Sequence, residues 1–372
     1  MLKEVPSQGF KRRSFIGAAM AAFAAASVAR ASPGSMLALD EAYPRLRSTI
    51  DITDPLQDAI MEAKRKGLGG VLIPSGEFKC RSLTLPSKVR LLGAGKGATR
   101  LRTIASDENA FITIEEGPII RSGIEHITLV GGTPETATNP RQWALEITAR
   151  PKEGEKITHG GWWWSKLDTV DIVSFGHGIN LAGDTSSKFL LPHQFLSFRD
   201  MAILLSQDAA GPAVRMTGED NQFVFQQCVF DRSGGMGPEG STLVEIGDPG
   251  LLSLGGAGPI LLLFQMCTFQ HADQAVAIRG SQNITFDTCW FEQLNSSILA
   301  TERALGIHIR SSRFANAAKL RPAIEFSAST AGSIQTNMFV GAETAVPYKI
   351  DEDADVDVLG NISTLGAGAV AE

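Results

Sequence analysis

The sequence contains little of what would mark several familiar classes of protein. Of its 372 residues only four are Cys and two are Tyr, and long helical patterns are nearly absent. The cysteines form no CxxC pair, which argues against a zinc or thiol redox motif. Glycine, in contrast, is abundant at 38 residues. This balance favours many short strands joined by turns.

Two further absences exclude other classes. The apolar run from Leu251 to Phe264 is broken by three glycines and a proline, so it is not expected to span a membrane. The glycine-rich segment Gly93–Gly97 lacks the GxxxxGK[ST] spacing of a phosphate-binding loop, and a tight turn is the better interpretation. No EF-hand or other dense metal motif is present either.

The N-terminal segment has the pattern of an export signal. Arg12 and Arg13 precede Phe15 and an Ala-rich apolar stretch, and Ala29-Arg30-Ala31 fits a signal-peptidase site. The segment resembles a twin-arginine signal, which implies export in the folded state to the periplasm or beyond. We therefore expect residues 1–31 to be removed, with no membrane association afterwards.

The mature chain is expected to be acidic. The segment 1–31 carries five Lys or Arg and one Glu, so its removal lowers the formal net charge from −6 to −10. An acidic surface argues against nucleic acid as a partner. It also disfavours a polyanionic ligand unless basic residues gather locally.

A repeat organises the later part of the chain. Five segments share the pattern apolar-x-apolar-x-x-(small or Cys)-x-Phe, the last with altered first residues, and they end at Phe230, Phe269, Phe291, Phe314 and Phe339. A period of 22–25 residues, with one longer step of 39, fits the coils of a β-solenoid. Alternating apolar residues place one row of side chains inside each coil, and stacking the coils about 4.8 Å apart buries that row and pairs the strand edges. The pattern predicts an internal ladder of Phe rings.

The same repeat assigns a role to the cysteines. Cys228, Cys267 and Cys289 align with Ser312 and Asn337 at the turn between the second and third strands of each coil. We expect them to be buried turn residues. Neighbouring coils are close enough for a disulfide, but parallel side-chain directions disfavour one.

The opening of the predicted solenoid carries a resemblance to a known family. A helix is expected over 56–66, with Asp54 as N-cap, Pro55 at the first position and Gly67 as C-cap. Short strand-like segments follow over 70–78, 83–86 and 89–95. This order resembles the pectate-lyase-like β-helix proteins, which include pectate lyases, rhamnogalacturonases, polyuronate epimerases and phage tailspike depolymerases. The resemblance covers about residues 45–360 and implies an all-β, right-handed parallel β-helix whose N-terminal helix caps the open end.

The expected organisation follows from these segments. Residues 1–31 form the signal, 32–50 a linker, 51–360 the β-helix with its cap, and 361–372 a C-terminal tail. The first strands of successive coils align on their inward apolar pairs. Their outward residues form one column of Glu146, Asn180, Arg215, Glu245, Ala277, Leu299 and Glu325, and a second of Thr148, Ala182, Thr217, Gly247, Arg279, Thr301 and Ser327.

In the polysaccharide-cleaving members of the family this face forms the substrate groove, so the resemblance places a candidate active site there. We take Arg215, Glu245, Asp248 and Arg279 as the candidate catalytic residues. A lyase or a uronate epimerase needs a cation and a base, whereas a glycosidase needs two carboxyl groups at a defined separation. A solvated ladder of ion pairs without catalytic function is the alternative.

Several other residues are candidate substrate contacts. They are Trp162, Trp163, Trp164, His177, Asp220 and Glu302. The tryptophans could stack on sugar rings or cover the solenoid wall. The segment around His177 resembles the Gly-His-Gly element of polygalacturonases, but the matching Asn-x-Asp and Asp-Asp motifs are missing, so a structural role stays open.

The sequence thus predicts a periplasmic or secreted carbohydrate-active enzyme, a polysaccharide lyase or glycosidase. A non-catalytic glycan-binding or structural β-helix and a polyuronate C5-epimerase are the alternatives. The partner expected is a polysaccharide, and homo-oligomerisation is left open. No cofactor is expected, although the family resemblance allows calcium held by aspartates on the coils.

Overall fold

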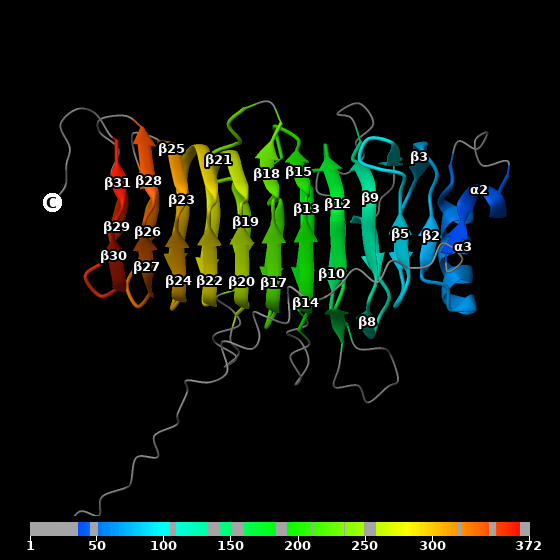
Figure 1. Cartoon of the computed structure of the whole chain (residues 1–372), viewed down its shortest axis with the longest axis horizontal. Coiled ribbons are helices and arrows are strands. Elements are labelled where there is room, and N and C mark those ends of the chain that lie inside the picture. The colour runs from blue at the N-terminus through cyan, green and yellow to red at the C-terminus, as the bar shows by residue number, and fades with distance from the viewer. Residues whose placement is uncertain are drawn as a thin grey trace, which may run out of the picture. The chain divides into compact units, whose positions relative to one another are not determined.

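The chain folds into a parallel β-helix, described here from a computed structural model. The structure describes residues 36–44, 51–104, 109–132, 142–150, 160–183, 192–209, 211–233, 235–248, 258–317, 321–341 and 347–364. Every pairing between the described strands is parallel. The coils lie side by side in Figure 1, from the helices at the N-terminal end of the solenoid to β31 at the other. The fold class predicted from the sequence is confirmed.

The strands form three rows, one for each side of a coil. The first row is β4 (Leu83–Leu85), β7 (Ala110–Ile114), β10 (Trp143–Thr148), β13 (His177–Ala182), β16 (Val214–Thr217), β19 (Thr242–Ile246), the second halves of β21 (Thr268–Arg279) and β23 (Trp290–Thr301), β26 (Ile324–Phe326) and β29 (Tyr348–Ile350).

The second row begins at the N-terminal cap and runs the length of the solenoid. It contains β1 (Met36–Ala38), β2 (Gly70–Leu72), β5 (Arg90–Leu92), the first parts of β9 (Gly123–Val130) and β12 (Lys166–Val173), β14 (Gln194–Arg199), β17 (Asn221–Gln226), β20 (Ile260–Gln265), β22 (Gln282–Asp287), β24 (Leu305–Arg310), β27 (Ala331–Gln335) and β30 (Asp355–Leu359), with β8 (Pro118–Ile120) and β11 (Gly161–Trp163) pairing at its margin.

The third row completes each coil. It contains β3 (Gly76–Cys80), β6 (Thr99–Thr103), the second parts of β9 and β12, β15 (Ala202–Leu205), β18 (Val229–Arg232), the first halves of β21 and β23, β25 (Arg313–Ala317), β28 (Met338–Gly341) and β31 (Ile362–Ser363).

The predicted Phe ladder is present in the core. Phe230, Phe269, Phe291, Phe314 and Phe339 stack with ring centroids 4.6–4.9 Å apart. A second ladder, Phe198, Phe225, Phe264 and Phe286, stacks beside it at 4.4–4.9 Å. All of these rings are at most 2% exposed, so each coil buries its inward row only because the next coil covers it.

The cysteines occupy the corner between the second and third rows, as predicted. Cys228, Cys267 and Cys289 are buried and free, and each thiol donates to a main-chain carbonyl of the preceding coil. The residue before each cysteine has a positive φ, 53–58°, which makes the corner sharp. Asn337 takes the same position and donates to the Ile309 carbonyl at 2.9 Å.

The N-terminal cap differs in detail from the prediction. Helix α3 (Thr53–Lys66) begins before Asp54, and the Asp51 carboxylate rather than Asp54 accepts from the Thr53 amide at 2.8 Å. Gly67 ends the helix in the left-handed conformation, φ 67°, as expected. A short helix α2 (Leu39–Ala42) and strand β1 lie in the segment predicted to be a linker, and β1 pairs with β2 as part of the solenoid.

The predicted signal peptide lies outside the described residues, as does the end of the C-terminal tail from 365 onward. No helix in the described part of the chain is both long and apolar enough to cross a membrane.

Candidate functional site

The outward side chains of the first row of strands form the first-strand face, and their column has the predicted register. Glu146 pairs with Asn180, Asn180 with Arg215, Arg215 with Glu245, and the pairing continues through Ala277 and Leu299 to Glu325. The column extends beyond the prediction, to Thr113 and Thr84 at one end and to Lys349 at the other. Neighbouring members lie one coil apart, about 4.8 Å.

Two of the predicted catalytic residues contact each other. Arg215 Nε donates to Glu245 Oε2 at 2.7 Å, and the two side chains are 39% and 35% exposed. The Arg215 guanidinium also lies over the Trp143 ring, 5.4 Å from its centroid. Arg215 is therefore held from two sides, by a carboxylate and by an aromatic face.

His177 belongs to the same cluster but is tightly packed. Its ring lies 4.6 Å from the Trp143 ring between centroids. On the other side it packs against Gly211, where a Cβ would fall 1.9 Å from the His177 ring. The buried Arg232 holds the Gly211 carbonyl at 2.8 Å and so fixes this contact. His177 has the packing of a positioning residue, and Trp143 is the member of this cluster that the sequence did not single out.

The other two predicted catalytic residues lie further along the face. Arg279 ends β21 and is exposed, two residues beyond the column that contains Arg215 and Glu245. Asp248 follows β19 and is half-buried. Glu302 is exposed in the turn between β23 and β24, with φ 54°. The structure brings together only Arg215 and Glu245 of the four predicted catalytic side chains through a described contact.

Two predicted substrate contacts are enclosed by the protein, which corrects the prediction for them. Trp162 is 1% exposed, and its Nε1 donates to Ser122 Oγ at 2.6 Å. Asp220 is fully buried, and its Oδ1 accepts from the His193 amide at 3.0 Å. Neither side chain can reach a ligand on the surface.

The buried corner around His193 has unusual electrostatics. His193 Nδ1 accepts from the Trp162 amide at 2.9 Å, and Nε2 lies 3.3 Å from the Ala182 carbonyl. Burial lowers the pKa of His193 to about 4. Burial raises the pKa of Asp220 well above its usual range, because no cation faces it among the described residues and Oδ2 has no hydrogen-bond partner.

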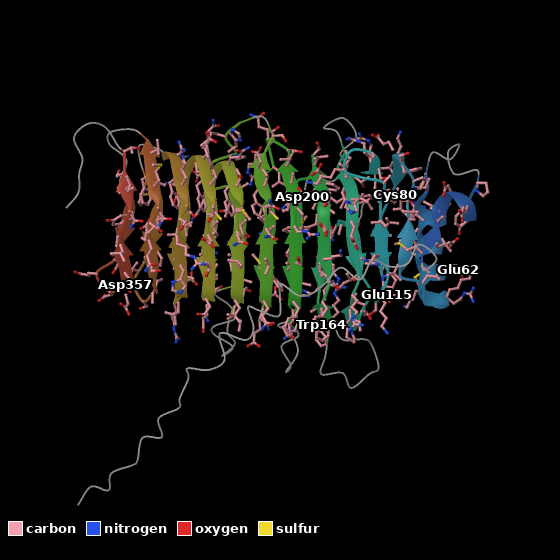
Figure 2. All side chains as sticks on the ribbon, viewed as in Figure 1. Glu62, Cys80, Glu115, Trp164, Asp200 and Asp357 are labelled. Atoms are coloured by element: carbon pink, nitrogen blue, oxygen red, sulfur yellow. The ribbon has the colours of Figure 1, made fainter. Side chains whose placement is uncertain are left out.

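The other two tryptophans are more accessible. Trp163 is half-buried, and its Nε1 donates to the Pro192 carbonyl at 2.7 Å. Trp164 is 54% exposed and stacks on Phe195, with centroids 5.3 Å apart and planes 5° from parallel. Trp164, labelled in Figure 2, has φ 48°, and this left-handed kink points it outward while Trp162 points inward.

A groove that the sequence did not predict lies at the N-terminal end of the same face. It encloses about 310 Å³ and is lined by Thr84, Thr113, Ile114, Glu115, Glu116, Glu146, Thr148 and Arg150. Two of the lining residues, Thr84 and Thr113, have their hydroxyl oxygens 3.3 Å apart. Only Glu146 and Thr148 of this set belong to the columns read from the sequence.

The carboxylates of the groove have different surroundings. Lys64 Nζ, from the capping helix α3, donates to both oxygens of Glu115 at 2.8 and 2.7 Å. Glu146 has no hydrogen-bond or ion-pair partner among the described residues. Glu115 is labelled in Figure 2, closer than Trp164 to the capped end of the solenoid. One carboxylate of the groove is thus held by an ion pair, and another has no such partner among the described residues.

No group of three or more His, Cys, Asp and Glu side chains in the described ranges is arranged to hold a metal ion. The calcium allowed by the family resemblance therefore has no dense ligand set in this part of the chain.

The fold was compared with those of known proteins. No family model matches the sequence, and no curated protein matches it. Solved structures do match. The chain is similar to the A-module of the mannuronan C-5 epimerase AlgE6 of Azotobacter vinelandii, with a TM-score of 0.61 and 16% identity over 89% of this chain and 100% of that one.

Two other structures have different activities on the same scaffold. PfbA, a surface adhesin of Streptococcus pneumoniae, gives a TM-score of 0.65 at 13% identity, covering 88% of this chain and 91% of that one. The tailspike protein gp49 of the Acinetobacter baumannii bacteriophage Fri1, a capsular polysaccharide depolymerase, gives 0.58 at 13% identity, covering 92% of this chain and 64% of that one. This chain is accordingly a right-handed parallel β-helix protein, and at these identities the likeness extends to the fold alone.

Proposed function

We propose that this protein is an exported polysaccharide-cleaving enzyme, a glycosidase, that holds its substrate along the first-strand face. The observation that carries the proposal is the groove in which Glu146, without a partner among the described residues, lies beside Glu115, which Lys64 Nζ holds in an ion pair. Glycoside hydrolysis uses two carboxyl groups, one to donate a proton and one to act as base or nucleophile.

The register of the strands supports this pairing. Thr113 is opposite Glu146, so Glu115 lies one coil and two residues away from Glu146. That offset corresponds to about 8 Å between Cα atoms, from a coil spacing of ~4.8 Å and a rise of ~3.3 Å per residue. Flexible Glu side chains spanning this offset can place a sugar between their carboxyl groups. In this assignment Glu146 is the general acid, and Glu115 is the base or nucleophile.

The substrate path follows the row of outward side chains. From the groove the column continues through Asn180 to Arg215 and Glu245, beside Trp143. Polar side chains at each coil supply hydrogen bonds to successive sugars. The epimerase and depolymerase neighbours act on polysaccharides by their titles, which is consistent with such a ligand for this fold.

A lyase is the second candidate, because Arg150 lies in the same groove as Glu146. A cation that binds a uronate carboxylate and a base that removes its α-proton are the two groups that β-elimination needs.

A depolymerisation screen over neutral and uronic-acid polysaccharides tests the proposal. A glycosidase releases reducing ends without ultraviolet absorption, a lyase releases unsaturated ends, and an epimerase changes composition at constant chain length. Glu146→Gln should lower kcat at least 100-fold, because it removes the proton donor, and Glu325→Gln on the same column serves as the control. Binding of a polysaccharide with no cleavage of any would reject the enzyme in favour of the non-catalytic alternative.

Export is tested separately. Replacement of Arg12 and Arg13 by Lys should abolish translocation through the twin-arginine route, and mass spectrometry of periplasmic protein should give a mature chain that begins at Ser32. Retention of the full-length chain in the periplasm would contradict cleavage after Ala31.

A further inference from the structure

The charges of the first-strand column are paired between neighbouring coils. Arg215 donates to Glu245 at 2.7 Å, and Lys349 to Glu325 at 2.7 Å. These are the two cations of the column that runs from Thr84 to Lys349, and each is matched by a carboxylate on the coil beside it. The remaining charged member is Glu146. The column therefore presents two neutral pairs and the carboxyl group of Glu146.

Arg215 is the cation at the centre of this face, and its guanidinium group is not fully available to bind a ligand carboxylate. A guanidinium that recognises a carboxylate uses two parallel N–H groups. In Arg215 the Nε–H group is already directed at Glu245, and the plane lies over Trp143. The pair as a whole has no net charge. The positive charge of Arg215, which would attract a uronate carboxylate, is cancelled by Glu245 on the next coil.

From this arrangement we infer that the substrate strand is a neutral polysaccharide, and that Glu245 is the residue that excludes polyuronates. The inference rests on the proposed function, since it names the substrate class of the same face. A uronate carboxylate in front of Arg215 would come within roughly 6 Å of the Glu245 carboxylate. A neutral hydroxyl-bearing sugar meets no such repulsion and can hydrogen-bond both partners of the pair.

The expected effect of Glu245 on affinity follows from Coulomb's law. One like charge at roughly 6 Å, at an effective dielectric constant of about 40, changes binding by about tenfold. Glu245→Gln removes that charge and keeps an oxygen that can accept from Arg215 Nε. The variant should therefore gain about tenfold in affinity for a uronate oligosaccharide, and the gain should shrink at high salt because the pair is partly exposed.

The experiment measures binding by calorimetry with the full chain. The probes are oligogalacturonate and oligomannuronate as uronate oligomers, and galactan and mannan oligomers of equal length as neutral ones. Glu325→Gln is the matched control, because it breaks an equivalent pair on the same column, three coils from Glu245. Both variants raise the net charge by one unit.

The expected result is that the wild type prefers a neutral oligomer, and that only Glu245→Gln gains uronate affinity relative to its affinity for the neutral oligomers. Equal gains in both variants would mean a net-charge effect and would overturn the role of Glu245. Wild-type binding of a uronate as tightly as of the neutral oligomers would overturn the substrate class while leaving the proposed function standing. If no polysaccharide is bound or cleaved, the proposed function fails and this inference fails with it.

Discussion

His193 occupies a buried corner in which only its neutral form is accommodated. The ring accepts from the Trp162 amide and faces the Ala182 carbonyl, and none of its atoms reaches solvent. Its pKa is about 4 in the folded protein, against about 6.5 for an unperturbed histidine. Because the folded pKa is the lower one, His193 contributes stability above pH 6.5, and that stability is lost as the pH falls toward 4.

The size of the loss follows from the two pKa values. One pKa unit corresponds to about 1.4 kcal/mol, so the full difference is about 3 kcal/mol, of which about 2 kcal/mol is lost by pH 5. This is a large part of the stability of a typical domain. We therefore expect the protein to resist urea at pH 7.5 and to lose a substantial part of that resistance between pH 6.5 and pH 5.

His193→Gln isolates this contribution. Its side-chain amide can accept from the Trp162 amide and donate to the Ala182 carbonyl but does not titrate. The assay is equilibrium unfolding in urea at pH 7.5, 6.5, 5.5 and 5.0, followed by tryptophan fluorescence and by circular dichroism. The difference in unfolding free energy between wild type and variant should change by about 2 kcal/mol from pH 7.5 to 5.0, in favour of the variant at low pH.

Asp220 must be separated from this effect because its main chain and side chain adjoin His193. Its raised pKa has the opposite sign, since protonation in acid relieves a buried charge. Repeating the series in the Asp220→Asn background completes a double-mutant cycle. Parallel pH curves for wild type and His193→Gln in both backgrounds would refute the assignment of acid sensitivity to His193.

Three other predictions follow from the core and its corners. Asp220→Asn should raise the melting temperature at pH 8 more than at pH 5. The pKa of Asp220 is raised in the folded protein, so the wild type has its full stability from this group below about pH 3.9 and loses it as the pH rises. An equal rise in melting temperature at both pH values would contradict this. Phe269→Ala, which removes a ring stacked 4.9 and 4.8 Å from Phe230 and Phe291, should reduce the unfolding free energy by about 3–5 kcal/mol in urea titrations. All four cysteines are buried, and burial raises the pKa of the Cys80 and Cys267 thiols, so a thiol reagent should label none in the native state and four in urea; labelling of fewer than four would indicate a disulfide.

The outward column could be predicted from the sequence because most coils contain their own register marker. The Phe ladder and the Cys228, Cys267 and Cys289 corner fix where each second and third strand lies. Once those are fixed, alternation assigns the first strands, and the pairing of Arg215 with Glu245 follows. The alignment of the sequence alone places this cation and its carboxylate on neighbouring coils.

The groove could not be predicted because the early coils have no such marker. Thr84, Thr113 and Glu115 come from coils without the Phe and Cys positions of the later coils. The sequence therefore does not predict their register against Glu146. The sequence predicts the ion-pair partner of Glu115 even less well, because Lys64 lies 51 residues away on the capping helix. Only the stacking of the first coils brings these groups together.

Local backbone conformation explains the remaining differences. The left-handed φ of Trp164 interrupts the alternation between β11 and β12, so Trp162 is buried and Trp164 is exposed. Asp220 lies in a tight turn after Gly218, where a Cβ would fall 2.8 Å from Gly183 of the preceding coil. An acidic residue just past a strand end usually faces solvent, but the closeness of the coils at this turn encloses it.

In a solenoid of this kind the chemistry of an outward residue depends on its neighbours on the adjoining coils. Each side chain inside the column has one neighbour about 4.8 Å away on either side. A charge on the column is therefore either cancelled or left uncompensated by residues 22–35 positions away in the chain. Arg215 taken alone has the properties of a uronate receptor, and Glu245 on the next coil removes them. Glu146 lies between Thr113 and Asn180, which leave its charge uncompensated. A single substitution on one coil can therefore change the ligand preference of the next without altering the fold, which the Glu245→Gln variant tests directly.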